Sequence, residues 1–345
     1  MTATHRGPVS AAIFAYRMRW KRRRFLFRIW RKRRQLISVR NRTTVIRPRM
    51  ILCFATMRNE MLRLPHFLAH YRKLGVAHFL IVDNGSNDGT AEYLTEQPDV
   101  SLWTTPHAYR LARFGMDWVG WLQWQYGHGH WCLTVDADEL LVYPHCQERT
   151  ITALTDWLDR QGLSSFGALM LDLYPKGPLG AGRYEAGDDP TKLLCWFDAA
   201  NYRHRQHPVY DNCWTQGGVR ERVFFADEPR NAPTLSKTPL VKWHWRHVYV
   251  SSTHQMLPRG LNHVFDHEGD SKPTGVLLHT KFLPNILGKS AEELTRRQHF
   301  ENSDLYESYH QRLSTGPDLW CPESQRYENP AQLIALGLMS KGRWV

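Results

Sequence analysis

The pattern of apolar and polar residues is regular from Met50 to about residue 145. Short apolar runs are separated by segments with apolar residues at helical spacing, as between Leu62 and Leu74, where Gly75 is a C-terminal stop signal. The four apolar runs are MILCFATM, VAHFLIVD, VSLWTT and HWCLTVDADELL. Strands and helices therefore alternate, which predicts an α/β fold with a doubly wound, mainly parallel sheet and helices on both faces.

Polar side chains gather where these predicted strands end. Ligands bind at the carboxyl ends of the strands in such sheets, so we expect the clusters to be neighbours in space. The clusters are Arg58, Asn59 and Glu60; Asp83 and Asn84; and Asp136, Asp138 and Glu139.

The acidic cluster suggests a metal site. If Asp136 and Asp138 lie in a strand, they point to the same side and repel each other unless a cation lies between them. Carboxylate oxygens suit Mn²⁺ or Mg²⁺, which keep positions open for phosphate oxygens. A strand end with solvated charges is the alternative. Asp83 is suited to accept hydrogen bonds from a base imide or a ribose hydroxyl. The alternative is that Asp83 only belongs to a helix-capping turn.

The second half of the chain has a different pattern, in which strand-like pieces alternate with loops rich in glycine and proline. Helices are expected over residues 291–313 and 329–339. We therefore divide the chain into residues 1–49, 50–150, 151–290 and 291–345, with the second and third segments forming the two halves of one domain.

Positive charge is concentrated at the N-terminus. The net charge is +12, and residues 1–49 hold sixteen Lys and Arg residues with no Asp or Glu. The rest of the chain carries 29 basic and 33 acidic residues. This balance predicts an enzyme-like, slightly acidic domain with a basic N-terminal extension.

Residues 11–36 mix basic blocks with aromatic and aliphatic residues, without one clean helical stripe. This composition favours binding to an anionic membrane surface. A nucleic-acid arm and a disordered, solvated tail are the alternatives. No apolar run reaches the length of a transmembrane helix and no signal peptide is recognisable, so we expect the mature chain to be the whole chain. The expected location is the cytoplasmic face of the cell membrane.

Cysteine and histidine give no metal pattern. The six cysteines form no C-x-x-C pair and are expected to be buried thiols, which suits a reducing compartment. His244 and His247, like His263 and His267, have metal-like spacing, but no cysteine or carboxylate completes a zinc site.

The ordered motifs resemble those of family 2 glycosyltransferases with the GT-A fold, in the bacterial branch that has an R-N-E opening. FATMRNEMLRLPHFLAHYRKLGVAHFLIVDNGSNDGT and the later WCLTVDADELL carry this resemblance over residues 50 to about 145. A looser likeness continues through MLDLYPKGPL, GGVRERVF, KTPLVKWHWRHVY and LLHTKFL. The opening A-T-M-R-N-E departs from the commoner P-x-Y-N-E.

This resemblance implies a nucleotide-sugar donor and a divalent cation. Arg58, Asn59, Glu60 and Asn84 then belong to the donor site, and Asp83 contacts the nucleotide base. Asp136 and Asp138 match the metal and diphosphate motif, Glu139 supports it, His279 completes the metal site, and Lys281 reaches a diphosphate oxygen.

The resemblance also implies inversion at the anomeric carbon, with a carboxylate that removes the proton of the acceptor hydroxyl. Asp172 and Glu221 are the candidate bases, and Asp227 is a third. The acceptor is expected to be a glycan or a lipid-linked sugar, in surface polysaccharide or lipopolysaccharide synthesis.

Two other functions remain open. The first is a sugar-1-phosphate nucleotidyltransferase, although that class usually has a glycine-rich loop after the first strand and FATMRNEM has no glycine. The second is a membrane or nucleic-acid adaptor with an inert acidic motif.

Overall fold

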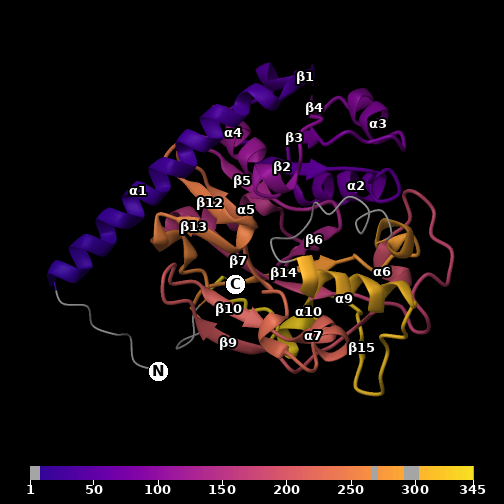
Figure 1. Ribbon diagram of the computed structural model, residues 1–345. Helices are drawn as coiled ribbons and strands as arrows, with labels where there is room; N and C mark the ends of the chain where they lie inside the picture. The colour runs from indigo at the N-terminus through magenta and orange to yellow at the C-terminus, as the bar shows by residue number, and fades with distance from the viewer. Residues whose placement is uncertain (1–7, 266–270, 291–302, 345) are drawn as a thin grey trace.

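The computed structural model describes residues 8–265, 271–290 and 303–344, and these residues form a nine-stranded mixed sheet (Figure 1). In spatial order the strands are β1 (Ile37–Arg40), β4 (Val100–Thr104), β3 (His78–Asp83), β2 (Leu52–Met57), β5 (Trp131–Thr134), β11 (Ser236–Lys242), β7 (Ser165–Asp172), β14 (Gly275–His279) and β6 (Glu139–Val142).

Most strands of this sheet share one direction. Strands β4, β3, β2 and β5 are parallel, and β7 is parallel to β14. Strands β1, β11 and β6 are antiparallel to their neighbours. Since β11 is antiparallel to both β5 and β7, six of the nine strands of this sheet run the same way. The predicted α/β class and mainly parallel sheet are confirmed.

Helices cover both faces of the sheet. They are α2 (Leu64–Leu74), α3 (Thr90–Glu96), α4 (Met116–Tyr126) and α5 (Ile151–Arg160). Successive side chains of a strand point to opposite faces. Thus Cys53 and Ala55 of β2 join the core under α2, α3 and α5, whereas Leu52 and Phe54 join the core under α4.

The second half adds smaller elements beside the sheet. They are α6 (Pro190–Leu193), β8 (Trp196–Phe197), β9 (Arg203–Gln206), β10 (Cys213–Gln216), α7 (Gly218–Phe224), β12 (Val248–Ser251), β13 (Gln255–Leu257), α9 (Ser303–Ser314), β15 (Gln325–Arg326) and α10 (Pro330–Ala335). Short 3₁₀ turns lie at Arg33–Gln35, Thr43–Val45, Arg110–Ala112, Pro229–Asn231, Ser252–His254 and Arg259–Asn262.

Helices α9 and α10 lie in the C-terminal segments where helices were predicted. Residues 291–302 and His267 lie outside the described residues. The described part of the chain includes all six cysteines, and each is a free thiol. Cys53, Cys132 and Cys213 are buried, as expected, whereas Cys146, Cys195 and Cys321 are only partly buried.

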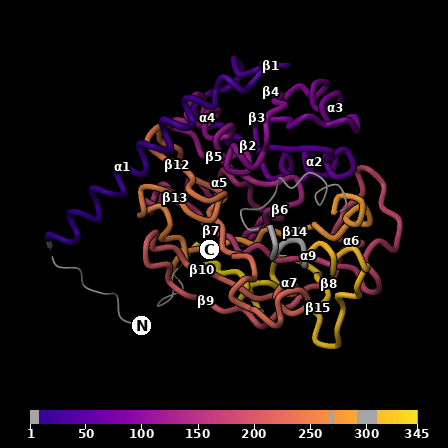
Figure 2. The backbone as a smooth tube through the Cα atoms, viewed as in Figure 1, coloured from indigo at the N-terminus to yellow at the C-terminus, as the bar shows by residue number. Residues whose placement is uncertain are grey.

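Residues 8–49 of the N-terminal extension are structured and pack on the domain. Helix α1 (Pro8–Lys32) lies against α4 and β12, and its N-terminal end projects beyond the rest of the fold (Figures 1 and 2). Strand β1 follows and pairs with β4, so the sheet begins at Ile37 rather than near the sequence-based boundary at residue 50. Residues 8–32 are therefore not the disordered tail that the sequence left open as an alternative.

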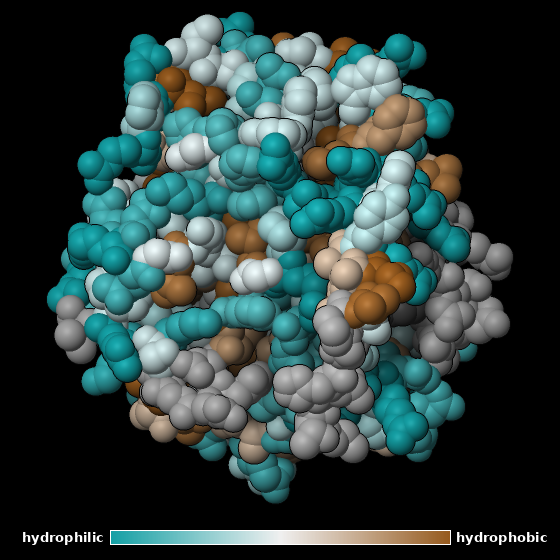
Figure 3. Space-filling view, turned by 90° about the vertical axis from the view of Figure 1, so that its left-hand side faces the viewer, coloured by the Kyte–Doolittle hydropathy of each residue, from teal (hydrophilic) through white to brown (hydrophobic). Residues whose placement is uncertain are grey.

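One side of the molecule has a surface of mixed polarity. The side of the molecule seen in Figure 3 is mostly hydrophilic, with hydrophobic residues exposed in separate places. Among the described helices, none combines the length and apolar character needed to cross a membrane.

Candidate active site

The acidic motif lies in a connection between two strands. Strand β5 ends at Thr134, and β6 begins at Glu139 on the far edge of the sheet. Asp136 and Asp138 therefore do not lie in a strand, so strand alternation does not apply to them, although both line the cavity described below. The chain passes the ends of β11, β7 and β14, so Asp136 reaches β11 and Asp138 reaches β14.

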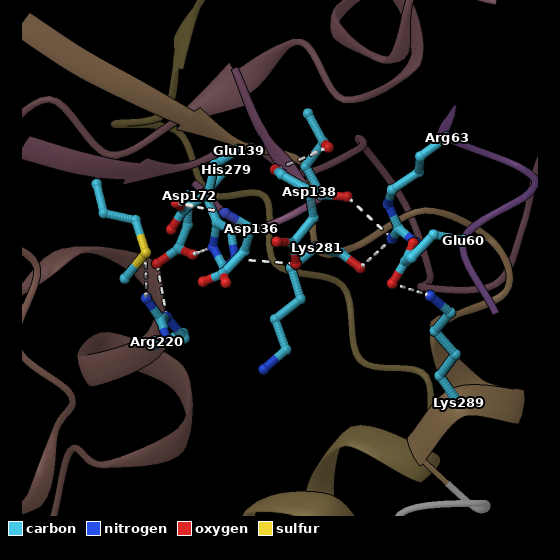
Figure 4. Close-up of polar contacts among 12 residues, drawn as sticks. Glu60, Arg63, Asp136, Asp138, Glu139, Asp172, Arg220, His279, Lys281 and Lys289 are labelled. Carbon is cyan, nitrogen blue, oxygen red and sulfur yellow. Dashed lines mark hydrogen bonds and ion pairs between the residues drawn. The ribbon is translucent and has the colours of Figure 1, made fainter. Parts of the chain in front are cut away.

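A chain of four polar side chains starts at Asp138 (Figure 4). Its Oδ2 lies 3.1 Å from Nε2 of His279, whose Nδ1 lies 2.5 Å from Oδ1 of Asp172. The second carboxylate oxygen of Asp172 accepts a hydrogen bond of 2.7 Å from Nε of Arg220. His279 is opposite Asp172 in parallel register and opposite Glu139 in antiparallel register, so sheet pairing brings these groups together.

The charges in this chain hold one another ionised. Burial alone would raise the pKa of Asp172, but Arg220 and His279 lower it to about 2. Burial would likewise raise the pKa of Asp138, but His279, Arg63 and Lys281 hold it well below its ordinary value. Burial tends to lower the pKa of His279, and the two flanking carboxylates raise it instead.

A buried lysine ammonium also lies beside the acidic motif. Nζ of Lys237, on β11, is 3.2 Å from Oδ2 of Asp136 and also contacts the carboxylate of Glu139. The second oxygen of Glu139 accepts a hydrogen bond of 3.2 Å from the backbone N–H of Asp136. Burial opposes the charge of Lys237, but the two carboxylates raise its pKa. Glu139 thus supports the motif, in agreement with the role that the resemblance implies.

The turn after β2 is tied to the end of β14. Glu60 forms ion pairs with Arg63 at 3.0 Å and Lys289 at 2.5 Å. Arg63 also donates hydrogen bonds of 3.2 Å to the backbone carbonyls of Thr280 and Lys281. Residues of the R-N-E opening therefore lie close to those that follow His279.

The turns after β2 and β3 also meet. Nη1 of Arg58 donates to the carbonyl oxygens of Asn84 and Gly85, at 3.1 and 2.7 Å. The backbone N–H of Asn59 donates to the hydroxyl of Ser86 at 2.9 Å. The structure therefore brings the three predicted polar clusters together at the carboxyl ends of the parallel strands.

Asp83 has a local structural role in this arrangement. Its carboxylate accepts hydrogen bonds from the backbone N–H groups of Gly85 and Ser86, at 3.0 and 3.1 Å, and from the Ser86 hydroxyl. The side chain is buried and does not line the cavity described below, whereas Asn84 does. Contact between Asp83 and a nucleotide base stays a prediction.

Both candidate bases are held by cationic side chains, and their role as bases stays a prediction. Asp172 is held between His279 and Arg220, and Glu221 is paired with Arg203 through both carboxylate oxygens. Neither carboxylate is among the described residues that line the cavity. Asp227 is exposed at the surface, 3.4 Å from Arg312.

The acidic motif and the turns after β2 and β3 surround a cavity of about 820 Å³ that is rich in basic side chains. Its acidic lining residues are Glu60, Asp136, Asp138 and Glu139, and its Lys and Arg residues are Arg58, Arg63, Arg220, Arg230, Lys237, Lys281 and Lys289. Among the described residues Lys281 has no ion-pair partner, and its ammonium lies 5.2 Å from the centre of the Tyr309 ring. Trp214, Phe225 and Tyr309 add aromatic surface.

Sequence reasoning missed Lys237, Arg63 and Arg220. Lys237 carried a usable signal, because a lysine within the otherwise uncharged run SKTPLV is costly to bury unless a carboxylate pairs with it. The motif GGVRER contains Arg220 next to the candidate Glu221, but no local pattern distinguishes their partners.

No protein-family model matches this chain, and no curated protein does. Solved structures give distant likenesses. A 4-diphosphocytidyl-2C-methyl-D-erythritol synthase is 15% identical, with 41% of this chain and 68% of that chain covered and a TM-score of 0.24. Mannosyltransferase PcManGT from Pyrobaculum calidifontis, in complex with GDP-Man and Mn²⁺, is 17% identical, with 46% and 47% covered and a TM-score of 0.28.

A third structure is described as a glucose-1-phosphate thymidylyltransferase from Bacillus anthracis in complex with sucrose. It is 11% identical, with 76% of this chain and 83% of that chain covered and a TM-score of 0.30. At these scores none of the three likenesses carries an argument about function.

Proposed function

We propose that this protein is a metal-dependent glycosyltransferase that moves a sugar from a nucleotide-sugar donor to a glycan or lipid-linked acceptor, with inversion. The observation that carries the proposal is the chain Asp138–His279–Asp172 at a basic cavity of about 820 Å³. A cavity of this size suits a ligand with several rings, and its excess of cationic groups suits a diphosphate.

Asp138 and His279 have the chemistry to bind Mn²⁺ or Mg²⁺. Their facing atoms are 3.1 Å apart, and Asp172 holds the opposite ring nitrogen, as carboxylates commonly do for metal-binding histidines. Within the described residues no group of three or more His, Cys, Asp or Glu forms a complete metal cage. Such a site suits a cation that takes further ligands from substrate phosphates and water, and the bound cation would offset charge on the leaving diphosphate.

The other lining residues suggest how a donor and an acceptor would be held. Lys281 is available to bind a diphosphate oxygen, and Arg58, Asn59 and Asn84 offer hydrogen bonds on the side of β2 and β3. Aromatic faces at Trp214 and Phe225 suit the apolar faces of sugar rings. We propose that the acceptor belongs to surface polysaccharide or lipopolysaccharide assembly.

The decisive experiment compares two reactions of the purified full chain. We expect nucleoside diphosphate to be released from a nucleotide sugar in the presence of Mn²⁺, and this release to disappear in Asp138→Ala. A panel of nucleotide sugars identifies the donor by thermal shift, since a ligand at a hundred times its dissociation constant stabilises the fold by about 2.7 kcal/mol.

The second reaction supplies a nucleoside triphosphate and a sugar 1-phosphate. Metal-dependent release of pyrophosphate from this mixture, with no release of nucleoside diphosphate from nucleotide sugars, contradicts the proposal and favours a nucleotidyltransferase. Absence of binding and turnover in both reactions favours a non-catalytic adaptor.

A further inference from the structure

Helix α1 has two apolar faces. The inner face packs on the domain, where Met18, Phe25, Leu26 and Ile29 contact a cluster formed by Tyr210, Val248 and Leu257. Ile29 is only 3% exposed. The outer face presents large hydrophobic side chains to solvent, and we call them the outer stripe: Val9, Ile13, Tyr16, Trp20, Phe27 and Trp30.

The spacing of the outer stripe places its members on one side of the helix. Their separations are four, three, four, seven and three residues, which is the repeat of a single helical face. They are between 43% exposed, at Trp30, and 73% exposed, at Val9. The apolar residues of α1 thus divide between two opposite faces, which is why the sequence shows no single stripe.

Exposed arginines flank the outer stripe on both sides. On an ideal helix, Arg17, Arg24 and Arg31 repeat every seven residues along one border, and Arg19 and Arg23 lie along the other. Residues 1–49 contain no acidic residue that would neutralise them. The outward surface of α1 therefore combines exposed aromatic rings with uncompensated positive charge.

The inner face fixes α1 to the rest of the fold. Nε of Arg28 lies 2.6 Å from a carboxylate oxygen of the fully buried Asp117, which also pairs with Arg113 at 2.7 Å. The same segment carries Tyr109 and Phe114, which line the cavity. Helix α1 is therefore tied to a segment that also contributes to the wall of the cavity.

We propose that the outer stripe of α1 binds the surface of an anionic lipid bilayer, with the helix lying in the membrane plane. Aromatic and aliphatic side chains enter the boundary between headgroups and acyl chains, and the flanking arginines contact anionic headgroups. A bilayer surface therefore contacts both the apolar side chains and the arginines of this face. Nucleic acid would use the charge but leave the apolar stripe exposed, and a second copy of the chain would place two strongly basic surfaces together.

The test is co-sedimentation of the full chain with vesicles of phosphatidylcholine alone and of phosphatidylcholine mixed with phosphatidylglycerol. The stripe variant is Trp20→Ser with Phe27→Ser and Trp30→Ser, and its control is Leu336→Ser, another exposed apolar position. The charge variant changes Arg17, Arg24 and Arg31 to Gln. Its matched control changes three other exposed arginines, Arg160, Arg183 and Arg326, to Gln.

We expect the wild type to bind the anionic vesicles far better than the neutral ones. Each neutralised arginine should weaken binding about fivefold, or about a hundredfold for all three, while the controls bind as the wild type does. The stripe variant should lose the part of the binding that survives high salt. All targeted side chains are exposed, and circular dichroism checks that each variant is folded.

Equal binding to both vesicle types, or charge and stripe variants that bind like their controls, overturns the proposal. Tighter binding to duplex DNA than to anionic vesicles overturns it as well. So does a dimer that the stripe variant dissociates in the absence of vesicle binding, because the stripe would then serve as a contact between copies.

Discussion

His279 of β14 and Asp172 of β7 face each other in parallel register, with Nδ1 of the ring 2.5 Å from a carboxylate oxygen. This pairing leaves Nε2 directed at Asp138, which lies at the cavity. Under the proposed function, Asp172 orients the histidine and the acceptor base is another group. The distinction can be measured.

Substitution of Asp172 by Asn should weaken metal binding about 10–100-fold, because His279 loses the carboxylate that orients its ring. The turnover number at saturating Mn²⁺ should stay close to that of the wild type. Metal titrations of transfer activity, with Glu221→Gln as the comparison, provide the measurement. A large loss of turnover at saturating metal, with an unchanged metal affinity, would restore Asp172 as the base.

Substitution of Asp138 by Ala should abolish transfer and leave the fold intact. The Asp138 side chain is 25% exposed and lies in a connection rather than in the hydrophobic core. Its removal therefore takes away the proposed metal ligand without creating a core cavity. Activity with Mn²⁺ and the thermal unfolding midpoint are the two readouts, and near-normal transfer would mean that the metal assignment is wrong.

Substitution of Lys237 by Met should destabilise the fold by about 3–5 kcal/mol, because Glu139 is left as a buried charge without its partner. Lys242→Met is the matched control on the same strand. Its ion pair with Asp159 is exposed, so the expected cost is below about 1 kcal/mol. Denaturant unfolding measures both, and equal losses would show that Lys237 contributes no more than a surface charge.

Stability should fall on mild acidification, partly because of His70. Burial lowers the pKa of His70 from 6.5 to about 4 in the folded protein, although the Leu141 carbonyl accepts a hydrogen bond from its ring. Above pH 6.5 both states are neutral at this position. Between pH 6.5 and about 4 the unfolded chain binds a proton that the folded chain does not, so the free energy of unfolding decreases by up to about 3 kcal/mol.

The control for this pH dependence is His70→Gln, which keeps a side-chain N–H for the Leu141 carbonyl but does not titrate. Its free energy of unfolding should change less between pH 7 and pH 5 than that of the wild type. An identical slope in His70→Gln would mean that this histidine is already solvated in the folded protein.

The sequence by itself determined the alternating strands and helices between Met50 and Thr134, and the presence of polar residues at the strand ends. Strand β2 and helix α2 follow from local periodicity, since residues close in the chain decide which side of an element is apolar. The placement of Arg58 beside Asn84 also follows, because parallel neighbouring strands end at the same edge.

Only the tertiary structure decided how the charges pair and which faces are covered. Lys237 meets Glu139 across 98 residues and His279 meets Asp172 across 107, and these contacts depend on the order of strands in the sheet. The two faces of α1 likewise became distinct only where the domain covers one of them. The local sequence pattern indicates which chemistry a side chain can perform. Its charge state and its partners depend on groups that folding brings from elsewhere in the chain.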